Sequence, residues 1–317
     1  MSESKTNNFT VTDFEHAKIR VEQGWLQGYT EEVPNGTLKI FKGIPYAAPP
    51  VGNLRFRRPQ NPGRWRGIRR ATQYSAAAVQ HVQEFGDEKA NVHGVPQMLA
   101  PSQYEEDCLY LNVWSPAKTQ EDKLPVFIWV HGGGMIAGSG VEVVCAGEGL
   151  AGRKDVIVVT LNYRLGLFGF FAHPELAEEG GGTCGNYGLY DIRKACLWVK
   201  ENIAAFGGDP NNITVAGQSG GARATGSLLV SPLMNGIVES GAITFGGACP
   251  ITRQEVEAAC QELMDYVGAS GIEDLRKMDA WDLFDAYEKV VPTGALGNIR
   301  FCIDGEFLPE NYYERIT

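Results

Sequence analysis

Two hydrophobic patterns alternate along most of the chain, and together they predict an α/β fold. Runs rich in apolar and β-branched residues occur at 109–114, 125–130, 155–161, 213–215 and 242–245. Apolar residues that recur near a helical period occur at 188–206, 252–267 and 279–290. The apolar and β-branched runs are typical of central, mostly parallel strands that are covered on both faces, and 125–130 is predicted to be fully buried. The periodic stretches predict helices that lie against such a sheet.

The N-terminal third has a different pattern. Residues 16–46 alternate polar and apolar positions between glycines, which predicts antiparallel hairpin strands. A connection rich in proline, glycine and arginine follows at 45–70, and 71–107 lacks a clear period and is predicted to be loop with short helices. We therefore expect a polar, loosely attached tail over 1–15 and one domain over 16–317, with a largely parallel sheet and an antiparallel front end.

Composition narrows the function classes. In the 317-residue chain 44% of the residues are hydrophobic and 21% are charged, which is typical of a soluble globular protein. The net charge of −10 argues against nucleic acid or an anionic membrane as a partner. No stretch approaches the ~20 apolar residues of a membrane span. The N-terminal residues are polar and do not resemble a secretory signal.

The cysteines point to a reducing compartment. Their number is odd and they are scattered without a C-x-x-C pair, at positions 108, 145, 184, 196, 249, 260 and 302. Zinc-ligand spacing is not met, so no metal is predicted, and a dense disulfide framework is not expected. These features predict buried free thiols and a cytoplasmic protein, and no motif for a cofactor is found.

The candidate nucleophile is Ser219. It lies in Gly217-Gln218-Ser219-Gly220-Gly221, between the β-branched run 213–215 and an alanine- and leucine-containing segment at 222–230. This G-x-S-x-G order is known as a strand–turn–helix elbow, in which Gly217 and Gly221 make room for a tight turn and the serine hydroxyl is exposed. With 39 glycines and 11 serines, about one chain in six would contain the pattern by chance, so the neighbouring segments must decide.

A candidate oxyanion site comes from a second motif. His131-Gly132-Gly133-Gly134 directly follows the strand predicted at 125–130. Consecutive glycines let backbone N–H groups face a substrate, and in this arrangement the N–H after the nucleophile completes the site. We expect His131 to be a structural hydrogen-bonding residue beside the turn rather than a base.

Five segments in order make the chain resemble the type-B carboxylesterase family, the cholinesterase-like branch of the α/β-hydrolases. They are Phe41–Ala47 with Pro49–Gly52 and Leu54–Phe56; Glu106–Val113; His131–Gly138; Asn162–Gly166 with Phe168–Phe170; and Gly185-Asn186 with Asp191, Trp198, Asn202, Ile203 and Phe206–Pro210. Asp304–Pro309 extends the likeness more weakly towards the end.

The resemblance implies a fold, an activity and a set of residue roles. It implies an α/β-hydrolase fold and hydrolysis of a small-molecule ester. Ser219 resembles the family nucleophile, and Gly133, Gly134 and Gly220 resemble the oxyanion donors. Arg55 and Glu106 match positions that form an internal ion pair in the family, which we interpret as structural.

Two departures from the family bear on substrate and location. Gln218 stands where glutamate is common, so the site lacks a negative charge and a cationic substrate is less expected. Cys108 lies where extracellular members pair with an upstream cysteine, but residues 76–80 offer none. This difference supports the cytoplasmic prediction.

The third departure concerns the base. In this fold the chain order is serine, acid, histidine, yet all five histidines, at 16, 81, 93, 131 and 173, precede Ser219. Asp304 and Glu306 precede the position of the family acid and are not assigned that role. The resemblance therefore predicts a chain without the C-terminal part that carries the acid and the histidine, with weak activity and an uncovered sheet edge that favours self-association.

Two other classes of function stay open. One is a non-catalytic binding or scaffold protein that keeps the hydrolase fold, which the missing histidine favours. The other is a dinucleotide-binding enzyme, which is the poorest match because no G-x-G-x-x-G follows a strand.

Overall fold

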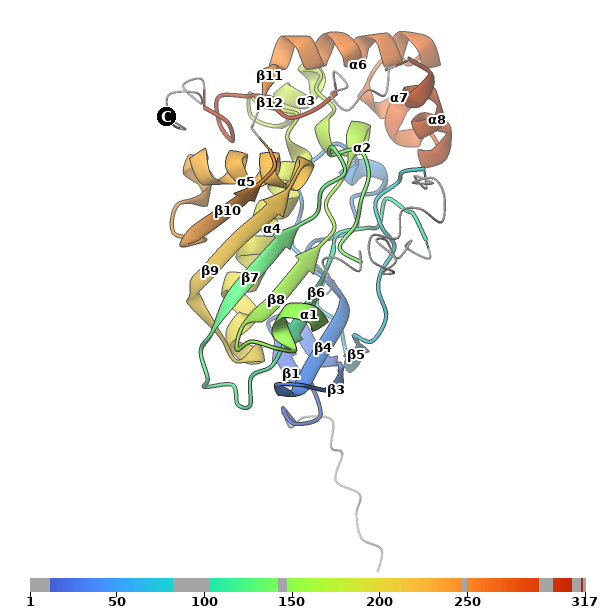
Figure 1. Cartoon of the computed structure of the whole chain (residues 1–317). Helices are drawn as coiled ribbons and strands as arrows, with labels where there is room; N and C mark the ends of the chain where they lie inside the picture. Colours follow the sequence, from blue (N-terminus) through green and yellow to red (C-terminus); the bar gives the residue numbers. More distant parts are fainter. Residues whose placement is uncertain are drawn as a thin grey trace, which may run out of the picture.

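The computed structural model describes residues 12–81, 103–141, 147–246, 250–290, 299–309 and 315. Its centre is a seven-stranded sheet with the order β10-β9-β7-β8-β6-β4-β3 (Figure 1). The strands of this sheet are β3 (Tyr29–Val33), β4 (Gly36–Pro45), β6 (Tyr110–Ser115), β7 (Leu124–Val130), β8 (Ile157–Leu161), β9 (Gly208–Gln218) and β10 (Ser240–Thr244). From β8 to β10 all neighbours are parallel, whereas β3, β4 and β6 pair antiparallel. The predicted α/β class, with antiparallel strands at the N-terminal side, is confirmed.

The remaining strands form two small sheets. β1 (Lys18–Val21), β2 (Gly24–Gln27) and β5 (Ile68–Arg70) make one, and β11 (Ile251–Thr252) pairs with β12 (Cys302–Ile303) in the other. The α-helices are α1 (Glu148–Ala151), α2 (Gly166–Phe170), α3 (Pro174–Glu179), α4 (Tyr187–Asn202), α5 (Gly220–Val230), α6 (Arg253–Val267), α7 (Ile272–Lys277) and α8 (Ala280–Val290). Short 3₁₀ helices span Gly52–Leu54, Ile203–Phe206 and Pro232–Met234.

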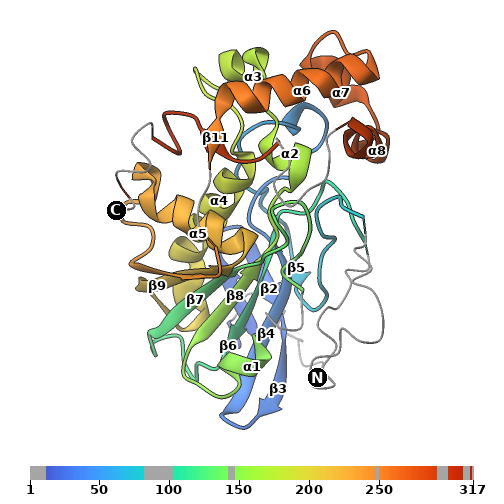
Figure 2. The same ribbon diagram turned by 45° about the horizontal axis from the view of Figure 1, so that its top comes forward.

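The main core lies between the sheet and the helices α4 and α5. On β7 the side chains of Val126, Ile128 and Val130 are at most 1% exposed and belong to this core. The first six residues of α4 are all buried, and from Ile192 onward the buried residues recur near the predicted helical period. The left-handed Gly207 (φ 84°) ends the 3₁₀ segment that follows α4. Helices α6, α7 and α8 lie together over the ends of the strands, beside α2 and α3 (Figure 2).

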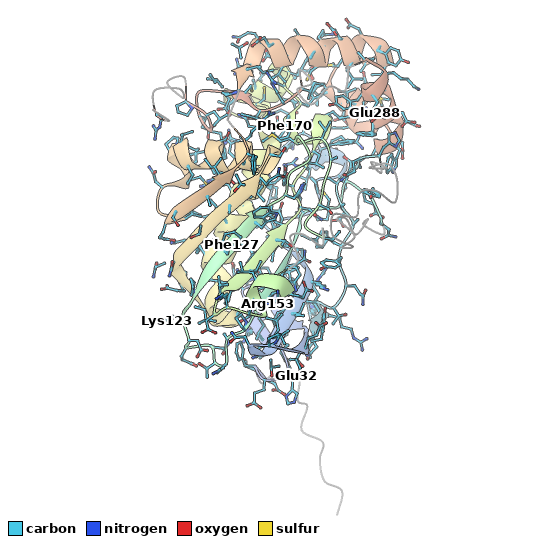
Figure 3. All side chains as sticks on the ribbon, viewed as in Figure 1. Glu32, Lys123, Phe127, Arg153, Phe170 and Glu288 are labelled. Atoms are coloured by element: carbon cyan, nitrogen blue, oxygen red, sulfur yellow. The ribbon has the colours of Figure 1, made fainter. Side chains whose placement is uncertain are left out.

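The opposite face of the sheet is only partly covered, so the prediction that 125–130 is fully buried was wrong. Around α1 a small cluster buries Leu38, Ile40, Trp114, Ala151 and Val158 on this face. Nearer β10, however, Phe127 and Trp129 of β7 are only half-buried, and Phe127 lies on the face turned to the viewer in Figure 3. A sheet residue is buried only where a second layer lies over it, and such a layer is absent there among the described residues.

Other predictions for the N-terminal half need correction. Within 71–107, the described residues 71–81 and 103–107 contain no helix, and 82–102 lie outside the described residues. Of the tail predicted over 1–15, residues 1–11 likewise lie outside them. Asp13 forms a bridge with Lys18, and Phe14 packs against the core, so this end of the tail is attached to the domain.

A buried ion pair joins the segment after β8 to α4. The Arg164 side chain donates to both carboxylate oxygens of Asp191 at 2.7 Å, and the Arg164 N–H donates at 3.1 Å. The two side chains are 3% and 0% exposed. Burial disfavours the Arg164 charge, but Asp191 outweighs it and raises the pKa of Arg164 above its ordinary value. The pair holds the end of β8 against α4.

The described cysteines are free thiols in the core. Five cysteines (108, 184, 196, 260 and 302) are free and buried, and positions 145 and 249 lie outside the described residues. Burial raises the pKa of the Cys196 thiol to about 12, so this group is an unreactive core residue at neutral pH.

None of the described helices combines the length and the apolar character needed to cross a membrane.

Candidate active site

The predicted elbow forms at the carboxyl end of β9. Gln218 is the last residue of β9, Gly220 is the first of α5, and Ser219 between them has φ 56° and ψ −117°. A non-glycine residue in this region is strained by about 1–3 kcal/mol, and the surrounding structure must hold it there. Part of that restraint comes from β10, because the Ser219 N–H donates to the Thr244 carbonyl at 3.1 Å.

The glycines on either side of Ser219 are required by close contacts. A methyl group on Gly217 would lie 2.3 Å from the Gly221 carbonyl oxygen. One on Gly221 would lie 2.1 Å from the Val130 oxygen at the end of β7. Real Cβ atoms do not approach that closely. Gly221 therefore serves the packing of α5 on β7 as well as the turn itself.

The glycine loop after β7 adopts backbone angles that favour glycine. Gly133 has φ 90° and Gly134 has φ 65°, and the loop closes through hydrogen bonds from the Ile136 and Ala137 N–H groups to the Gly133 carbonyl at 3.1 and 3.0 Å. A buried side chain also holds the loop, since the Gln80 amide exchanges hydrogen bonds of 2.7 and 2.9 Å with the Gly138 backbone. Sequence reasoning missed Gln80, because a glutamine in a loop carries no motif.

The loop and the elbow meet where the oxyanion site was predicted. A methyl group on Gly220 would lie 2.8 Å from the Gly134 nitrogen and 2.9 Å from the Met135 nitrogen. Within the described residues, the N–H groups of Gly133, Gly134 and Met135 donate no hydrogen bond. The structure thus brings Gly133, Gly134 and Gly220 together with Ser219. It also adds Met135, whose φ of 66° no sequence rule predicts for a non-glycine residue.

Gln218 lies at the same meeting point. Gln218 is exposed. A methyl group on Gly132 would lie 2.8 Å from the side-chain oxygen of Gln218 and 3.4 Å from the Ser219 Cβ. The side chain of Gln218 and the glycine loop therefore face each other beside the serine. An amide at this place brings hydrogen-bonding capacity without charge.

His131 is part of the framework under the loop. It is 1% exposed, its ring stacks on Tyr163 at a centroid distance of 4.4 Å, and its Nδ1 lies 2.9 Å from the Gly132 oxygen. The Tyr163 hydroxyl donates to the His131 carbonyl at 3.1 Å. This arrangement fits a structural residue that fixes the start of the glycine loop.

No described side chain stands as a base beside Ser219. In the described part of the chain, no hydrogen bond joins the Ser219 hydroxyl to a histidine, aspartate or glutamate. His16 pairs with Asp13, His81 with Glu288, and His173 caps α3. His93 lies outside the described residues.

The two carboxylates near the end of the chain serve a turn. Asp304 accepts the N–H groups of Glu306 and Leu308 at 3.1 and 2.9 Å, and burial raises the pKa of its carboxyl. Glu306 binds Arg58 and accepts the Thr183 hydroxyl at 2.7 Å. Both carboxylates are therefore committed to local contacts.

Arg55 and Glu106 form a two-point contact away from the elbow. The Arg55 Nε and Nη2 donate to the two Glu106 oxygens at 2.7 and 2.6 Å. The Nη1 donates to the carbonyls of Leu275 and Met278 at the end of α7, at 2.6 and 2.9 Å. The pair ties the segment before β6 to α7, which agrees with the structural role inferred for it.

A mixed sheet flanked by helices, with a strained serine after a central parallel strand, defines the α/β-hydrolase fold. Comparison with known proteins specifies the family. The sequence profile of the carboxylesterase family matches residues 15–317, and the chain belongs to this family.

Individual relatives agree with this assignment. The chain is 42% identical over 260 residues to the fumonisin B1 esterase of Sphingopyxis macrogoltabida, covering 81% of this chain and 45% of that protein. It is 36% identical over 277 residues to the para-nitrobenzyl esterase of Bacillus subtilis (strain 168), covering 87% and 53%. A solved carboxylesterase of Geobacillus stearothermophilus at pH 6.8 superimposes with a TM-score of 0.80 at 34% identity, covering 95% of this chain and 59% of that one. The chain spans about half the length of these relatives.

Proposed function

We propose that the protein is a carboxylic ester hydrolase in which Ser219 is the nucleophile. One observation carries the proposal: the strained Ser219 lies at a strand end against a glycine loop in which the N–H groups of Gly133 and Gly134 have no acceptor among the described residues. The names of the esterases that the chain resembles support an ester substrate. In this reaction the Ser219 oxygen attacks the ester carbonyl, the bond to the alcohol breaks, and water then releases the acid from the acyl-enzyme.

The oxyanion of each tetrahedral intermediate would lie among the N–H groups of Gly133, Gly134 and Gly220. One such donor typically contributes about 3 kcal/mol to transition-state stabilisation. The serine proton needs an acceptor, and a positioned base typically contributes about 10²–10⁴-fold. Since no described base contacts Ser219, we propose that the 317-residue chain alone hydrolyses esters slowly.

The test measures release of the alcohol product from a model ester. Stopped-flow release of p-nitrophenol from p-nitrophenyl butyrate should show a slow phase above the buffer rate, which Ser219→Ala abolishes. Gly134→Ala, which strains the loop, should weaken the same phase. Ser219→Ala and the parent protein behaving alike would overturn the proposal.

A non-catalytic binding or scaffold protein is the second candidate. The absence of a base hydrogen-bonded to Ser219 among the described residues favours it. A fluorophosphonate probe labels only an activated serine, so stoichiometric labelling at Ser219 rejects the binding role. If the probe does not label Ser219 at all, the binding role is favoured.

We also propose that copies of the chain associate through β10. All five residues of this edge strand are exposed, and it contains no proline or charge, the usual protections of an edge. Ile243, Phe245 and the neighbouring Leu229 are 49%, 87% and 42% exposed. Exposed apolar side chains beside an open edge favour pairing with a second copy.

Analytical ultracentrifugation tests this association. We expect a sedimentation coefficient that rises with protein concentration, and Ile243→Lys should suppress the rise. Tyr266→Lys is a matched control, because Tyr266 is 57% exposed but belongs to α6. A monomer at every concentration would contradict the proposal.

A further inference from the structure

The segments that build the candidate active site carry a single formal charge. They are the strand β7 with its glycine loop (124–141), β9 from 213 onward with α5 and the turn after it (213–238), and β10 with the residues after it (240–252). Across these three ranges the only aspartate, glutamate, lysine or arginine is Arg223, and Glu239, which separates the second range from the third, contacts Lys200 at 3.3 Å. A lone cation among neutral segments has a larger effect on a bound charge than one that neighbouring acids compensate.

Arg223 lies directly beside the nucleophile. It is four residues after Ser219 on α5, and its N–H donates to the Ser219 carbonyl at 3.1 Å. Residues four apart share one face of a helix, and side chains lean towards the helix N-terminus, which here is the elbow. Arg223 and Gly226, the half-buried residues of α5, lie on that face, and a methyl group on Gly226 would lie 3.5 Å from the Ile243 side chain of β10.

The end of β10 confines this region from the other side. A methyl group on Gly246 would lie 2.7 Å from the Ser219 carbonyl oxygen and 3.4 Å from the Arg223 nitrogen. The backbone after β10 thus passes over the first turn of α5. The backbone of Arg223 therefore lies against this segment, one helical turn from the nucleophile.

The guanidinium has no partner within the part of the chain that the structure describes. Arg223 forms no ion pair, side-chain hydrogen bond or cation–π contact there. By contrast, Arg164 binds Asp191 and Arg276 binds Glu179, each through two hydrogen bonds. An arginine that is half-buried yet free has its planar set of donors available for a ligand.

Gln218, the residue before the nucleophile, leaves the positive charge of Arg223 uncompensated. Gln218 stands where glutamate is common in the family, and its side chain lies against the glycine loop. A carboxylate at this position would offset the charge of Arg223 and repel an anionic substrate. With glutamine the positive charge stays uncompensated, and the amide can donate a hydrogen bond.

We propose that Arg223 is a specificity residue that binds a free carboxylate on the ester, so that the preferred substrates are half-esters of dicarboxylic acids. This inference rests on the proposed hydrolysis at Ser219. Guanidinium and carboxylate form paired, charge-assisted hydrogen bonds. Holding the carboxylate at Arg223 positions the ester carbonyl between Ser219 and the N–H groups of the glycine loop.

The test uses binding, so it does not depend on turnover. Ser219→Ala protein is titrated calorimetrically with monoethyl glutarate and with its neutral amide counterpart, ethyl glutaramate, at low salt. We expect the anion to bind about 10-fold more tightly, as charge-assisted hydrogen bonds imply. Adding Arg223→Gln should remove this preference, whereas Arg223→Lys should retain part of it.

Controls separate a local effect from bulk charge and from misfolding. Arg66→Gln makes the same charge change at an exposed position outside the site and should leave the preference intact. The melting temperature of Arg223→Gln should lie close to that of its parent, since the Arg223 side chain has no ion pair or hydrogen bond to lose among the described residues. Equal affinity for the two ligands, or a preference that survives Arg223→Gln, overturns the inference.

The proposed function fails independently, through an unlabelled Ser219 or a Ser219→Ala variant that behaves like the parent protein. If turnover is measurable, Arg223→Gln should raise KM for mono-p-nitrophenyl glutarate about 10-fold and change KM for p-nitrophenyl butyrate little. An equal loss on both substrates would also contradict a role in specificity.

Discussion

β8 and β10 are five-residue strands of one parallel arrangement, yet they have opposite environments. β8 lies between β7 and β6, and every one of its residues is buried. Within the described part of the chain, β10 pairs with β9 alone and lies at the edge of the sheet, and every one of its residues is exposed. Two isoleucines show the contrast: Ile157 in β8 is 0% exposed, and Ile243 in β10 is 49% exposed.

The contrast shows that strand formation and burial have different requirements. One neighbour is enough to satisfy half of a strand's backbone groups and to fix its register. Burial needs a neighbour at each edge and a layer over each face. The candidate active site lies between the two regions, with its glycine loop after β7 and its serine held by a hydrogen bond to β10.

The largest expected difference is in the free energy of unfolding, when an ion pair in the buried part of the sheet and one beside β10 are each broken. Asp191→Asn leaves the buried Arg164 charge without its counter-charge and should lower the free energy of unfolding by about 3–5 kcal/mol. Glu239→Gln, next to β10, breaks a contact with Lys200 at 3.3 Å between side chains that are 37% and 27% exposed. It should cost less than about 1 kcal/mol. Urea unfolding measures both values, and similar losses would contradict the contrast.

The second comparison uses one residue type in both strands. Ile157→Ala empties space in the core and should cost about 2–5 kcal/mol. Ile243→Ala should cost less than about 1 kcal/mol, because half of that side chain already contacts water. The two variants should be compared by urea unfolding at a concentration where the protein is monomeric. A large loss for Ile243→Ala there would show that β10 is covered in solution.

The sequence predicted where strands form but not how they are covered. The runs 155–161 and 242–245 were both predicted as strands and both form one, as β8 (Ile157–Leu161) and β10 (Ser240–Thr244). Their opposite exposure depends on which segments pack against them, a property that no window of residues contains. The six-residue α7 was missed because it is too short to show a helical period.

For the site, the motif placed the elbow and the glycine loop, since glycine spacing reports backbone geometry directly. The contribution of Gln80 was not predictable, because it depends on a contact with Gly138 across 58 positions of the chain. Arg223 was also overlooked. Its interpretation depends on how few charges occur in two stretches, 124–141 and 213–252, that are distant in sequence and come together only in the fold.

The smallest expected effect is a change in how the free energy of unfolding depends on pH, and it arises at Glu179. Glu179 of α3 accepts hydrogen bonds from Arg276 at 2.8 and 2.7 Å and from Arg57 at 3.1 Å. The hydrogen bonds from Arg276 are the main cause that lowers the pKa of Glu179 from 4.5 to about 2. The folded state thus keeps this carboxylate ionised where the unfolded chain binds a proton. Its stabilising contribution is complete above pH 4.5 and is lost as the pH falls towards 2.

Glu179→Gln should therefore flatten the curve of unfolding free energy against pH between about 4.5 and 2, with a modest loss at neutral pH because the side chain is 35% exposed. Glu178→Gln is the matched control, because Glu178 is the preceding residue of α3, is exposed, and forms no ion pair among the described residues. The acid limb of the control should follow the parent protein. If the two glutamine variants have the same acid limb, the Arg276 contact contributes nothing to stability, and the link between α3 and α7 must depend on other packing, such as the Ile272 N–H that donates to Glu175 at 3.0 Å.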